Sequence, residues 1–414
     1  MSSGEIGVGM IGHAFMGAVH SHAWRTVHRF FPVPLTPRLA VLCGRDAART
    51  ADAAARFGWA DVETDWRAAV ARDDVQLVDI CTPGDTHAEI ALAALAAGKH
   101  VLCEKPLANS VAEAEEMAAA AEAAAARGVR AMVAFNYRRV PALALARKLV
   151  ADGRLGQIRH VRAVYLQDWL SDENSPMTWR LRKDKAGSGS LGDLGAHIVD
   201  AAQWVTGQDI TGVSAIAETF VRSRPAEGGS AGNGQIAAGG VAMGEVAMGE
   251  VTVDDAALFL ARFSGGALGS FEATRYALGR KNAMRLEVNG SRGSIAFDFE
   301  SMNELSFFDG DVPGAEAGFR RILVTEADHP YVGAWWPPGH LLGYEHTFTH
   351  EVADLLDAIA GGTDPAPSFA DGLRVQRVLA AVENSASAGS TWTPVGTAGG
   401  AVNGRAEMEG AAVS

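Results

Sequence analysis

Three polar side chains from two distant parts of the sequence could together move a proton: Lys105, Asp193 and His197. Lys105 follows a short apolar segment, His100–Cys103, that is typical of a buried strand. Asp193 and His197 are four residues apart, so they share one face of a predicted helix. An amine beside a carboxylate and an imidazole is suited to acid–base chemistry on a hydroxyl group. Each feature alone has a plainer explanation: a loop lysine before a turn proline, and a structural Asp–His pair or half of a metal site.

A glycine-rich turn near the start of the chain predicts a site for a dinucleotide. Gly12, Ala14 and Gly17 fit the pattern Gly-x-Gly-x-x-Gly with alanine in the second place, between a predicted strand (5–11) and a predicted helix. The first glycine permits a tight turn, a small second residue lets backbone approach a pyrophosphate, and the third lets helix and strand pack closely. Free N–H groups at the helix start would bind the phosphates. We therefore expect Gly12, Ala14, Phe15 and Met16 to contact the cofactor.

The end of the second predicted strand (38–43) bears on which cofactor is used. An NAD site usually has an acidic residue there, which binds the ribose hydroxyls. This sequence has Gly44 followed by Arg45, with Arg49 one helical turn further on. A neutral residue with arginines suits a 2′-phosphate, so the pattern favours NADP over NAD. The alternative is that both arginines are solvated helix residues.

Strands and helices alternate through the first third of the chain. Further strands are predicted at 75–81, 100–103 and 129–135, with helices between them, and Ser110 with Glu113 forms a capping box. This alternation predicts a parallel doubly wound sheet, an α/β Rossmann domain over residues 1–135.

The remainder predicts an α+β domain, residues 136–395, with a large and mostly antiparallel open sheet. Seven strand-like segments follow residue 210, after a half-buried strand at 158–169 on which Tyr165, Gln167 and Trp169 would share one side. A Gly/Ala-rich stretch, 225–250, is expected to be a mobile surface loop. Residues 396–414 are expected to be a disordered tail.

Composition excludes several classes of function. The formal net charge of −13 argues against nucleic-acid or anionic-membrane partners. The start has no positively charged segment typical of a signal peptide, and no apolar run reaches the length of a membrane span. Three isolated cysteines indicate reduced thiols in a cytoplasmic protein. No metal site is expected: Cys43, Cys81 and Cys103 lack ligand spacing, and the His346/His350 pair lacks a third ligand.

Taken together, these motifs resemble the glucose–fructose oxidoreductase / inositol dehydrogenase / rhizopine-catabolism (Gfo/Idh/MocA) family. The resemblance covers about residues 5–392, and several longer strings look like the levoglucosan dehydrogenase branch. The matching motifs are Gly12-x-Ala14-x-x-Gly17 with His20, Cys81-Thr82-Pro83-x-x-x-His87, Glu104-Lys105-Pro106, Asn136-Tyr137-Arg138, Trp179-Arg180 and Gly192-Asp193-Leu194-Gly195-Ala196-His197.

The resemblance implies hydride transfer between a nicotinamide and a hydroxyl or ketone of a sugar, anhydrosugar or cyclitol. Lys105 would be the general base or acid, His197 would hydrogen-bond the reacting hydroxyl, and Asp193 would orient a neighbouring hydroxyl. A cis Lys105–Pro106 bond is also expected. Cofactor-binding residues would further include Thr82, Pro83, His87, Glu104, Lys105, Asn136, Trp179 and Arg180; substrate-binding residues would be Lys105, Asn136, Tyr137, Gln167, Trp169, Asp193 and His197.

Four alternatives stay open at this point. The chain could be an NADPH-dependent keto-sugar reductase, an inositol dehydrogenase, a glycoside hydrolase that recycles bound NAD, or a co-repressor that binds dinucleotide without catalysis. Joint retention of the three acid–base residues argues against the co-repressor. A homodimer or homotetramer is expected, because the predicted sheet leaves an open surface.

Overall fold

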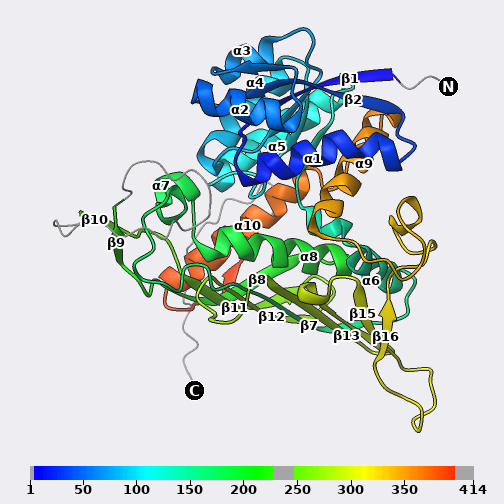
Figure 1. Cartoon of the computed structure of the whole chain (residues 1–414). Coiled ribbons are helices and arrows are strands. Elements are labelled where there is room, and N and C mark those ends of the chain that lie inside the picture. The colour runs from blue at the N-terminus through cyan, green and yellow to red at the C-terminus, as the bar shows by residue number, and fades with distance from the viewer. Residues whose placement is uncertain (1–3, 227–246, 397–414) are drawn as a thin grey trace, which may run out of the picture.

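The computed structural model describes residues 4–226 and 247–396 and contains two large sheets with helices between and around them. Figure 1 shows the N-terminal sheet with its helices on top and the second, larger sheet below. Both sheets match the predicted fold class: a Rossmann domain and an α+β domain.

The first sheet has six parallel strands in the order β3-β2-β1-β4-β5-β6. Its central strands consist mainly of buried apolar residues, because helices cover both faces of the sheet; Val8, Ile80 and Leu102, for example, are fully buried. The order reverses direction between β1 and β4, so a crevice opens outside their carboxyl ends, where such sheets bind ligands. The strands are β1 (Gly4–Ile11), β2 (Leu35–Cys43), β3 (Asp61–Glu63), β4 (Leu77–Ile80), β5 (His100–Cys103) and β6 (Ala131–Val133).

The connecting helices begin and end where local sequence signals place them. Ser110 caps one of them by accepting a hydrogen bond from the N–H of Glu113 at 3.2 Å, as the capping box predicts. Another ends at Gly58, which has the left-handed conformation that glycine tolerates. The helices are α1 (Phe15–Phe30), α2 (Ala47–Phe57), α3 (Trp66–Ala71), α4 (His87–Ala96) and α5 (Val111–Ala125), with a short 3₁₀ turn η1 (Gly84–Thr86).

The second sheet has nine strands in the order β16-β15-β14-β13-β7-β12-β11-β8-β17. Only the β12–β7 pair is parallel within the described part of this sheet. Its strands are β7 (Ile158–Leu166), β8 (Ile210–Glu218), β11 (Ala256–Phe263), β12 (Leu268–Thr274), β13 (Ala283–Gly290), β14 (Gly293–Asp298), β15 (Glu304–Asp309), β16 (Arg320–Leu323) and β17 (Thr393–Pro394). A separate hairpin joins β9 (Ser223–Pro225) to β10 (Met248–Glu250).

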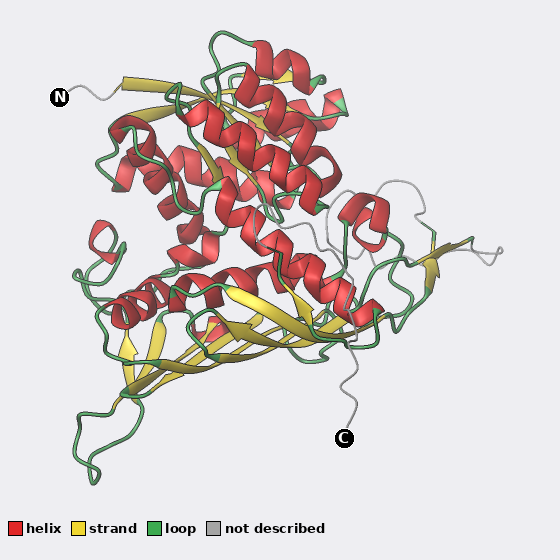
Figure 2. Cartoon of the chain, turned by 180° about the vertical axis from the view of Figure 1, so that it is seen from behind, coloured by secondary structure: helices red, strands yellow, loops and turns green. Residues whose placement is uncertain are grey.

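Helices cover one face of the second sheet and connect it to the first (Figure 2). They are α6 (Pro141–Ala151), α7 (Lys183–Ala186), α8 (Ala196–Thr206), α9 (Tyr344–Gly361) and α10 (Phe369–Ser387). Short turns are η2 (Asn136–Arg139), η3 (Trp179–Leu181), the π-helical η4 (Leu191–Gly195), η5 (Phe299–Ser301) and η6 (Val332–Ala334). α9 packs Phe348, Val352 and Leu356 into one core with Trp24 of α1. The C-terminal helices therefore belong physically to both halves, and the division at residue 135 stays a prediction.

Some predicted boundaries differ from the structure. The strand expected at 158–169 ends at Leu166, so Gln167 and Trp169 follow it in a loop. The helix expected from Asp193 starts as the π-helical turn η4 and becomes α-helical at Ala196. The elements β3 and α3 were not predicted. Residues 227–246 of the expected mobile loop and 397–414 of the expected tail lie outside the described residues.

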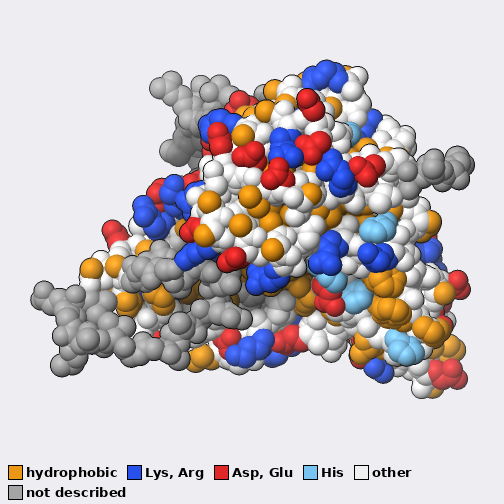
Figure 3. All heavy atoms as spheres, turned by 45° about the horizontal axis from the view of Figure 1, so that its top comes forward, with side chains coloured by type: hydrophobic (Ala, Val, Ile, Leu, Met, Phe, Trp, Pro, Cys, Tyr) orange, Lys and Arg blue, Asp and Glu red, His pale blue; other side chains and the backbone are white. Residues whose placement is uncertain are grey.

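Charged side chains of both signs lie on the surface of the molecule. Figure 3 shows acidic and basic side chains interspersed on one face of the molecule, without a field of one sign. Among the helices of the described segments, none has the length and apolar character needed to cross a membrane.

Candidate active site

The turn between β1 and α1 has the backbone shape that a pyrophosphate requires. Gly12 has a φ of +100°, and a Cβ there would lie 2.6 Å from the carbonyl oxygen of Cys81. A Cβ on Gly17 would lie 2.3 Å from the carbonyl oxygen of Gly12, so the first turn of α1 packs directly on this loop. Ala14 caps α1 without a side-chain hydrogen bond, which leaves N–H groups available for phosphates. The residues present thus fit a dinucleotide.

Aromatic contacts hold the outer side of this turn. Phe15 is 57% exposed, and its ring stacks on Tyr344 of α9 with centroids 6.3 Å apart. Met16 packs against the core that α1 shares with α9. The C-terminal half of the chain therefore reaches the cofactor turn through Tyr344, a residue absent from the predicted site.

At the end of β2, the structure explains why residue 44 is a glycine. A Cβ on Gly44 would lie 2.5 Å from the ring of His13 and 2.6 Å from Oγ1 of Thr50. His13 Nε2 is itself 3.1 Å from Thr50 Oγ1, and burial lowers the pKa of His13, so the ring is neutral. A neutral imidazole thus occupies the place where an NAD site usually carries a carboxylate. Arg45 is exposed, and Arg49 is paired with Asp46 at 3.8 Å.

Thr82, Pro83 and His87 form the wall beyond β4. The ring nitrogens of His87 lie 2.9 Å from the carbonyl oxygen of Thr82 and 3.0 Å from that of Pro106. His87 therefore ties this wall to the turn after β5. These two contacts of the His87 ring hold the backbone around the crevice in place, and direct contact of His87 with the cofactor stays a prediction.

Lys105 lies at the carboxyl end of β5, next to the same crevice. The Lys105–Pro106 peptide bond is cis, as expected. Lys105 Nζ donates to the backbone oxygen of Asp193 at 2.9 Å and lies 3.2 Å from Asp193 Oδ1. Two residues 88 positions apart in the sequence are thereby brought into direct contact.

Asp193 is placed by the π-helical turn η4, and Asp254 holds the start of that turn. The carboxylate of Asp254 accepts hydrogen bonds from the N–H groups of Gly189 at 2.7 Å and Leu191 at 2.8 Å. Burial alone would raise the pKa of Asp193, but the charges of Lys105, Arg275 and Arg180 hold it well below its ordinary value. Asp193 is therefore an anion between cations.

His197 lies one turn further, at the start of α8, and is 7% exposed. Its ring stacks on Tyr137 with centroids 4.4 Å apart, which fixes its orientation. Burial, together with the charge of Lys105, lowers the pKa of His197 well below its ordinary value. Its Nδ1 is buried without a hydrogen-bond partner among the described residues. The site thus combines a lysine, an anionic carboxylate and a neutral imidazole.

Two of the predicted substrate residues, Tyr137 and Gln167, belong to a hydrogen-bonded wall beside His197. Tyr137 and Tyr165 share a hydrogen bond of 2.6 Å, and both Tyr165 and Gln167 donate to Asn282 Oδ1, at 2.6 and 2.8 Å. Burial raises the pKa of Tyr137 to about 12, so its hydroxyl keeps its proton. Tyr137 is consequently a support for His197, whereas Trp169, 37% exposed, keeps surface free for a ligand.

The other predicted cofactor residues divide into buried and exposed ones. Asn136 is buried in η2 and donates to Thr347 Oγ1 at 2.9 Å. Glu104 is 5% exposed and faces the protein interior. Trp179 is 37% exposed, with the guanidinium of Arg180 4.5 Å from its ring centroid. Whether these four contact the cofactor stays a prediction.

Sequence reasoning missed several residues of the site. Arg275, 1% exposed, lies 3.8 Å from Asp193 Oδ2 and 5.5 Å from the ring of Trp169. Asn282 joins Gln167 to Tyr165. Neither lies in a recognisable motif, because each follows or precedes an ordinary strand. A single sequence offers no signal for them beyond their place at strand ends.

The histidine pair His346/His350 has structural contacts. His346 Nδ1 accepts a hydrogen bond from the N–H of Gly343 at the start of α9, and His350 Nε2 accepts one from Trp335 Nε1 at 2.7 Å. Burial lowers the pKa of His350 to about 3. Both histidines stabilise the loop before α9.

Comparisons with known proteins agree with this geometry. Residues 6–135 match the family described as oxidoreductase family, NAD-binding Rossmann fold, and residues 143–296 match the GFO/IDH/MocA C-terminal domain. Levoglucosan dehydrogenase of Pseudarthrobacter phenanthrenivorans is 42% identical over 94% of this chain and 98% of its own. Inositol 2-dehydrogenase of Rhizobium meliloti is 25% identical over 72% of this chain and 75% of its own.

Solved structures extend the comparison. An oxidoreductase domain protein from Kribbella flavida is 63% identical, with a TM-score of 0.89, over 95% of this chain and 100% of that one. Levoglucosan dehydrogenase in complex with NADH and levoglucosan is 40% identical, with a TM-score of 0.87, over 95% of this chain and 99% of that one. The family model matches the Rossmann domain, and levoglucosan dehydrogenase is 42% identical over 94% of this chain. The chain therefore belongs to the Gfo/Idh/MocA family of NAD-binding oxidoreductases.

Proposed function

We propose that this protein transfers a hydride between a nicotinamide cofactor and a secondary hydroxyl or ketone of a sugar, anhydrosugar or cyclitol, as a levoglucosan or glycoside 3-dehydrogenase does. The observation that carries the proposal is the meeting of Lys105 Nζ with Asp193, at 2.9 and 3.2 Å, beside neutral His197 and next to the cofactor crevice. The similarity to a dehydrogenase solved with NADH and levoglucosan supports the same substrate class.

The three side chains have separate roles in this reaction. A bound nicotinamide supplies the hydride acceptor or donor. Lys105 removes the proton of the reacting hydroxyl in oxidation and returns it in reduction. His197, neutral and held against Tyr137, hydrogen-bonds that hydroxyl. Asp193 stays ionised and orients a neighbouring hydroxyl while it holds the lysine amine in place.

The substrate wall suits a polar ring with one apolar face. Gln167 and Asn282 provide amide groups fixed by their mutual hydrogen bond, and Trp169 provides an exposed indole surface. Aromatic faces bind the apolar side of a sugar ring, while fixed amides bind its hydroxyls. Asn136 and Tyr137 are buried behind this wall, and their contact with the substrate stays a prediction.

For the cofactor, we propose that the protein uses NADP as well as NAD. Gly44 and the neutral His13 present no carboxylate that would repel a 2′-phosphate, and exposed Arg45 is available to bind it. The relative solved with NADH supports use of NAD. If NADP is preferred, the second candidate function, reduction of a keto-sugar with NADPH, follows from the same residues.

We also propose a homodimer or homotetramer built on the open face of the second sheet. No described helix covers that face (Figure 1). Leu258 and Leu260 of β11 lie on it, exposed, together with Ile216 of β8 and Leu268 of β12. Exposed apolar side chains gathered on one sheet face mark an interaction surface. Sedimentation of the full chain measures the assembly, and a monomer at micromolar concentration would contradict this proposal.

One assay tests the function. The purified protein is incubated with NAD and NADP separately against levoglucosan, glucose, inositols and the corresponding 3-keto sugars with reduced cofactor, and the absorbance of the reduced nicotinamide is followed. We expect turnover with levoglucosan or a related sugar. Absence of turnover with every substrate and both cofactors would refute the proposal.

A further inference from the structure

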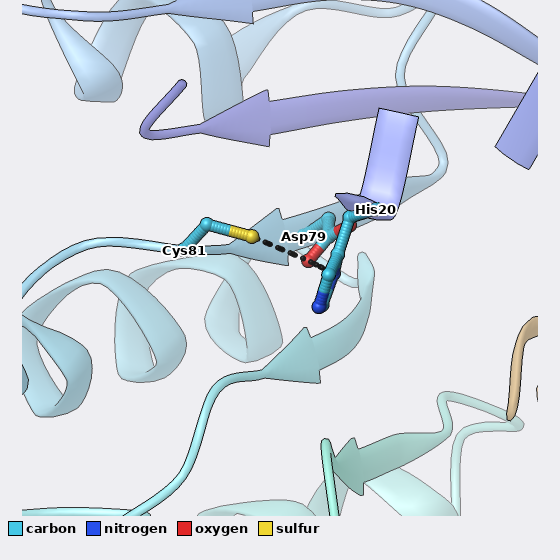
Figure 4. A group of neighbouring side chains, drawn as sticks. All are labelled: His20, Asp79 and Cys81. Atoms are coloured by element: carbon cyan, nitrogen blue, oxygen red, sulfur yellow. Dashed lines mark hydrogen bonds and ion pairs between the residues drawn. The ribbon is translucent and has the colours of Figure 1, made fainter. Parts of the chain in front are cut away.

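A buried histidine lies between two carboxylates directly behind the candidate active site. His20 of α1 is 1% exposed; its Nδ1 is 3.0 Å from both oxygens of Asp79, and its Nε2 is 3.0 Å from Glu104 Oε1. Figure 4 shows the ring of His20 turned toward Asp79, with Cys81 beside them. With both carboxyl groups ionised, both ring nitrogens of His20 donate, so the ring carries two protons.

The surroundings of His20 agree with a charged ring. Burial alone would lower the pKa of His20, but the charge of Asp79 and its hydrogen bond raise it well above its ordinary value. Trp24 Nε1 also donates to Asp79, at 2.7 Å, and Glu351 of α9 lies within electrostatic reach. The ring of Phe348, also from α9, covers the imidazole at a centroid distance of 5.3 Å.

A metal ion is the competing explanation, because His20, Asp79 and Cys81 offer three possible ligand atoms within 4.8 Å of one another. The distances favour hydrogen bonding instead. Cys81 Sγ donates to Asp79 Oδ1 at 3.5 Å, and burial raises the pKa of this thiol, which opposes the thiolate that a metal needs.

The cluster is connected to the candidate base through Glu104. While Glu104 Oε1 faces His20, its Oε2 accepts a hydrogen bond from the backbone N–H of Lys105 at 3.0 Å. His20 itself lies five residues after Phe15, the start of the helix whose N–H groups face the phosphate turn. One side chain thereby connects the helix of the cofactor cradle with the backbone of the lysine.

We propose that His20 is a positioning residue that acts through Glu104 to fix the Lys105 backbone relative to helix α1, and so to fix the lysine amine relative to the bound nicotinamide. The proposal rests on the proposed role of Lys105 as the acid–base group. Proton transfer is sensitive to such placement: a misplacement of about 1 Å can cost about a hundredfold in rate.

The test is His20→Gln. A glutamine amide can donate to one carboxylate but turns its oxygen toward the other, so the contact with Asp79 or with Glu104 is lost. We expect kcat to fall by about tenfold or more, while KM for the sugar and the Kd of the reduced cofactor, measured by fluorescence, change less than about threefold because the phosphate turn is untouched.

Two matched controls separate positioning from loss of stability. Trp24→Phe removes the other donor to Asp79 in the same core, and His28→Gln makes the same chemical change at an exposed position of α1. Both should retain kcat within about threefold, even if Trp24→Phe lowers the melting temperature. In a double variant with Glu104→Gln, the kcat losses should not multiply, because both changes break one connection.

The outcomes are distinguishable. Equal kcat losses in His20→Gln and Trp24→Phe, or losses that multiply in the double variant, would overturn the positioning role. If His20→Gln does not fold, Glu104→Gln alone decides, because it breaks the same connection: kcat should fall by about tenfold, and an unchanged kcat would overturn the proposal. A wild-type protein inactive on every sugar would refute the proposed function, and this inference with it.

Discussion

Replacing Glu351 with glutamine should stabilise the protein at alkaline pH and not at acidic pH. Glu351 lies in α9, is 1% exposed, and its Oε1 has no hydrogen-bond partner among the described residues. Burial raises the pKa of this carboxyl to about 8. The charge of Glu104 also raises it, whereas the charges of Arg139 and His20 lower it. The folded protein therefore keeps a proton that the unfolded chain releases.

The magnitude follows from linkage between protonation and folding. Below pH 4.5, the ordinary value of a glutamate, both states are protonated and Glu351 costs no stability through ionisation. Between pH 4.5 and about 8, only the unfolded state ionises, so the free energy of unfolding falls by about 1.4 kcal/mol per pH unit. At pH 8 and above, the accumulated cost is about 4–5 kcal/mol, and it then stays constant. Glutamine carries no such proton and avoids the cost.

Urea unfolding, followed by far-UV circular dichroism at pH 5, 6.5 and 8, measures the difference. The stability gained by Glu351→Gln should be below about 1 kcal/mol at pH 5 and grow to about 4 kcal/mol at pH 8. Glu122→Gln is the matched control, because it makes the same chemical change at an exposed position of α5. A gain at Glu351→Gln that is the same at all three pH values would show that the folded carboxyl is not protonated, and would refute the reasoning.

Four other predictions address the site. Lys105→Met should lower kcat by about a hundredfold or more, which is the usual contribution of general acid–base catalysis. Cofactor affinity, measured by fluorescence titration, should stay intact, because the hydrogen bonds of Lys105 Nζ go to Asp193. A variant that keeps most of its rate would contradict the assigned role. Arg45→Ala should raise KM for NADP about tenfold and leave KM for NAD nearly unchanged; equal changes would mean that Arg45 does not contact the 2′-phosphate. Gly12→Ala should abolish binding of both cofactors in calorimetry, since its Cβ would lie 2.6 Å from a backbone oxygen; retained affinity would contradict the cradle. Arg275→Met should lower kcat/KM for the sugar by about tenfold through the loss of a charged contact with Asp193; an unchanged pH profile and kcat/KM would exclude that contact.

Local sequence signals predicted most of the fold. The alternation of apolar strands with helices gave the parallel sheet, and the strand at His100–Cys103 begins and ends where it was expected. The glycine turn at Gly12 and the cap at Ser110 were also predicted, because each depends on residues only a few positions apart. The end of β7 was placed three residues too late, since Gln167 and Trp169 continue the alternation that Tyr165 begins, although the backbone has left the sheet.

The sequence predicted less well which residues from distant parts of the chain contact one another. Lys105 and Asp193 could be expected to meet only because their motifs resembled a family, and the structure brings them to 3.2 Å. No sequence pattern marked Arg275 or Asn282 as site residues. The contact between His20 and Glu104 was not predicted either, because each residue lies in a motif that was assigned to cofactor binding.

The amino-acid sequence by itself determined where strands, helices, caps and the phosphate turn form, because these depend on side-chain periodicity and backbone preference within one or two turns of chain. Tertiary structure alone decided that α9 packs beside α1, that Arg275 faces Asp193, and that His20 bridges two carboxylates. The physical reason is that ion pairs and hydrogen bonds are strong only when side chains lie a few ångströms apart. Tertiary packing alone brings residues from distant parts of the sequence to such distances.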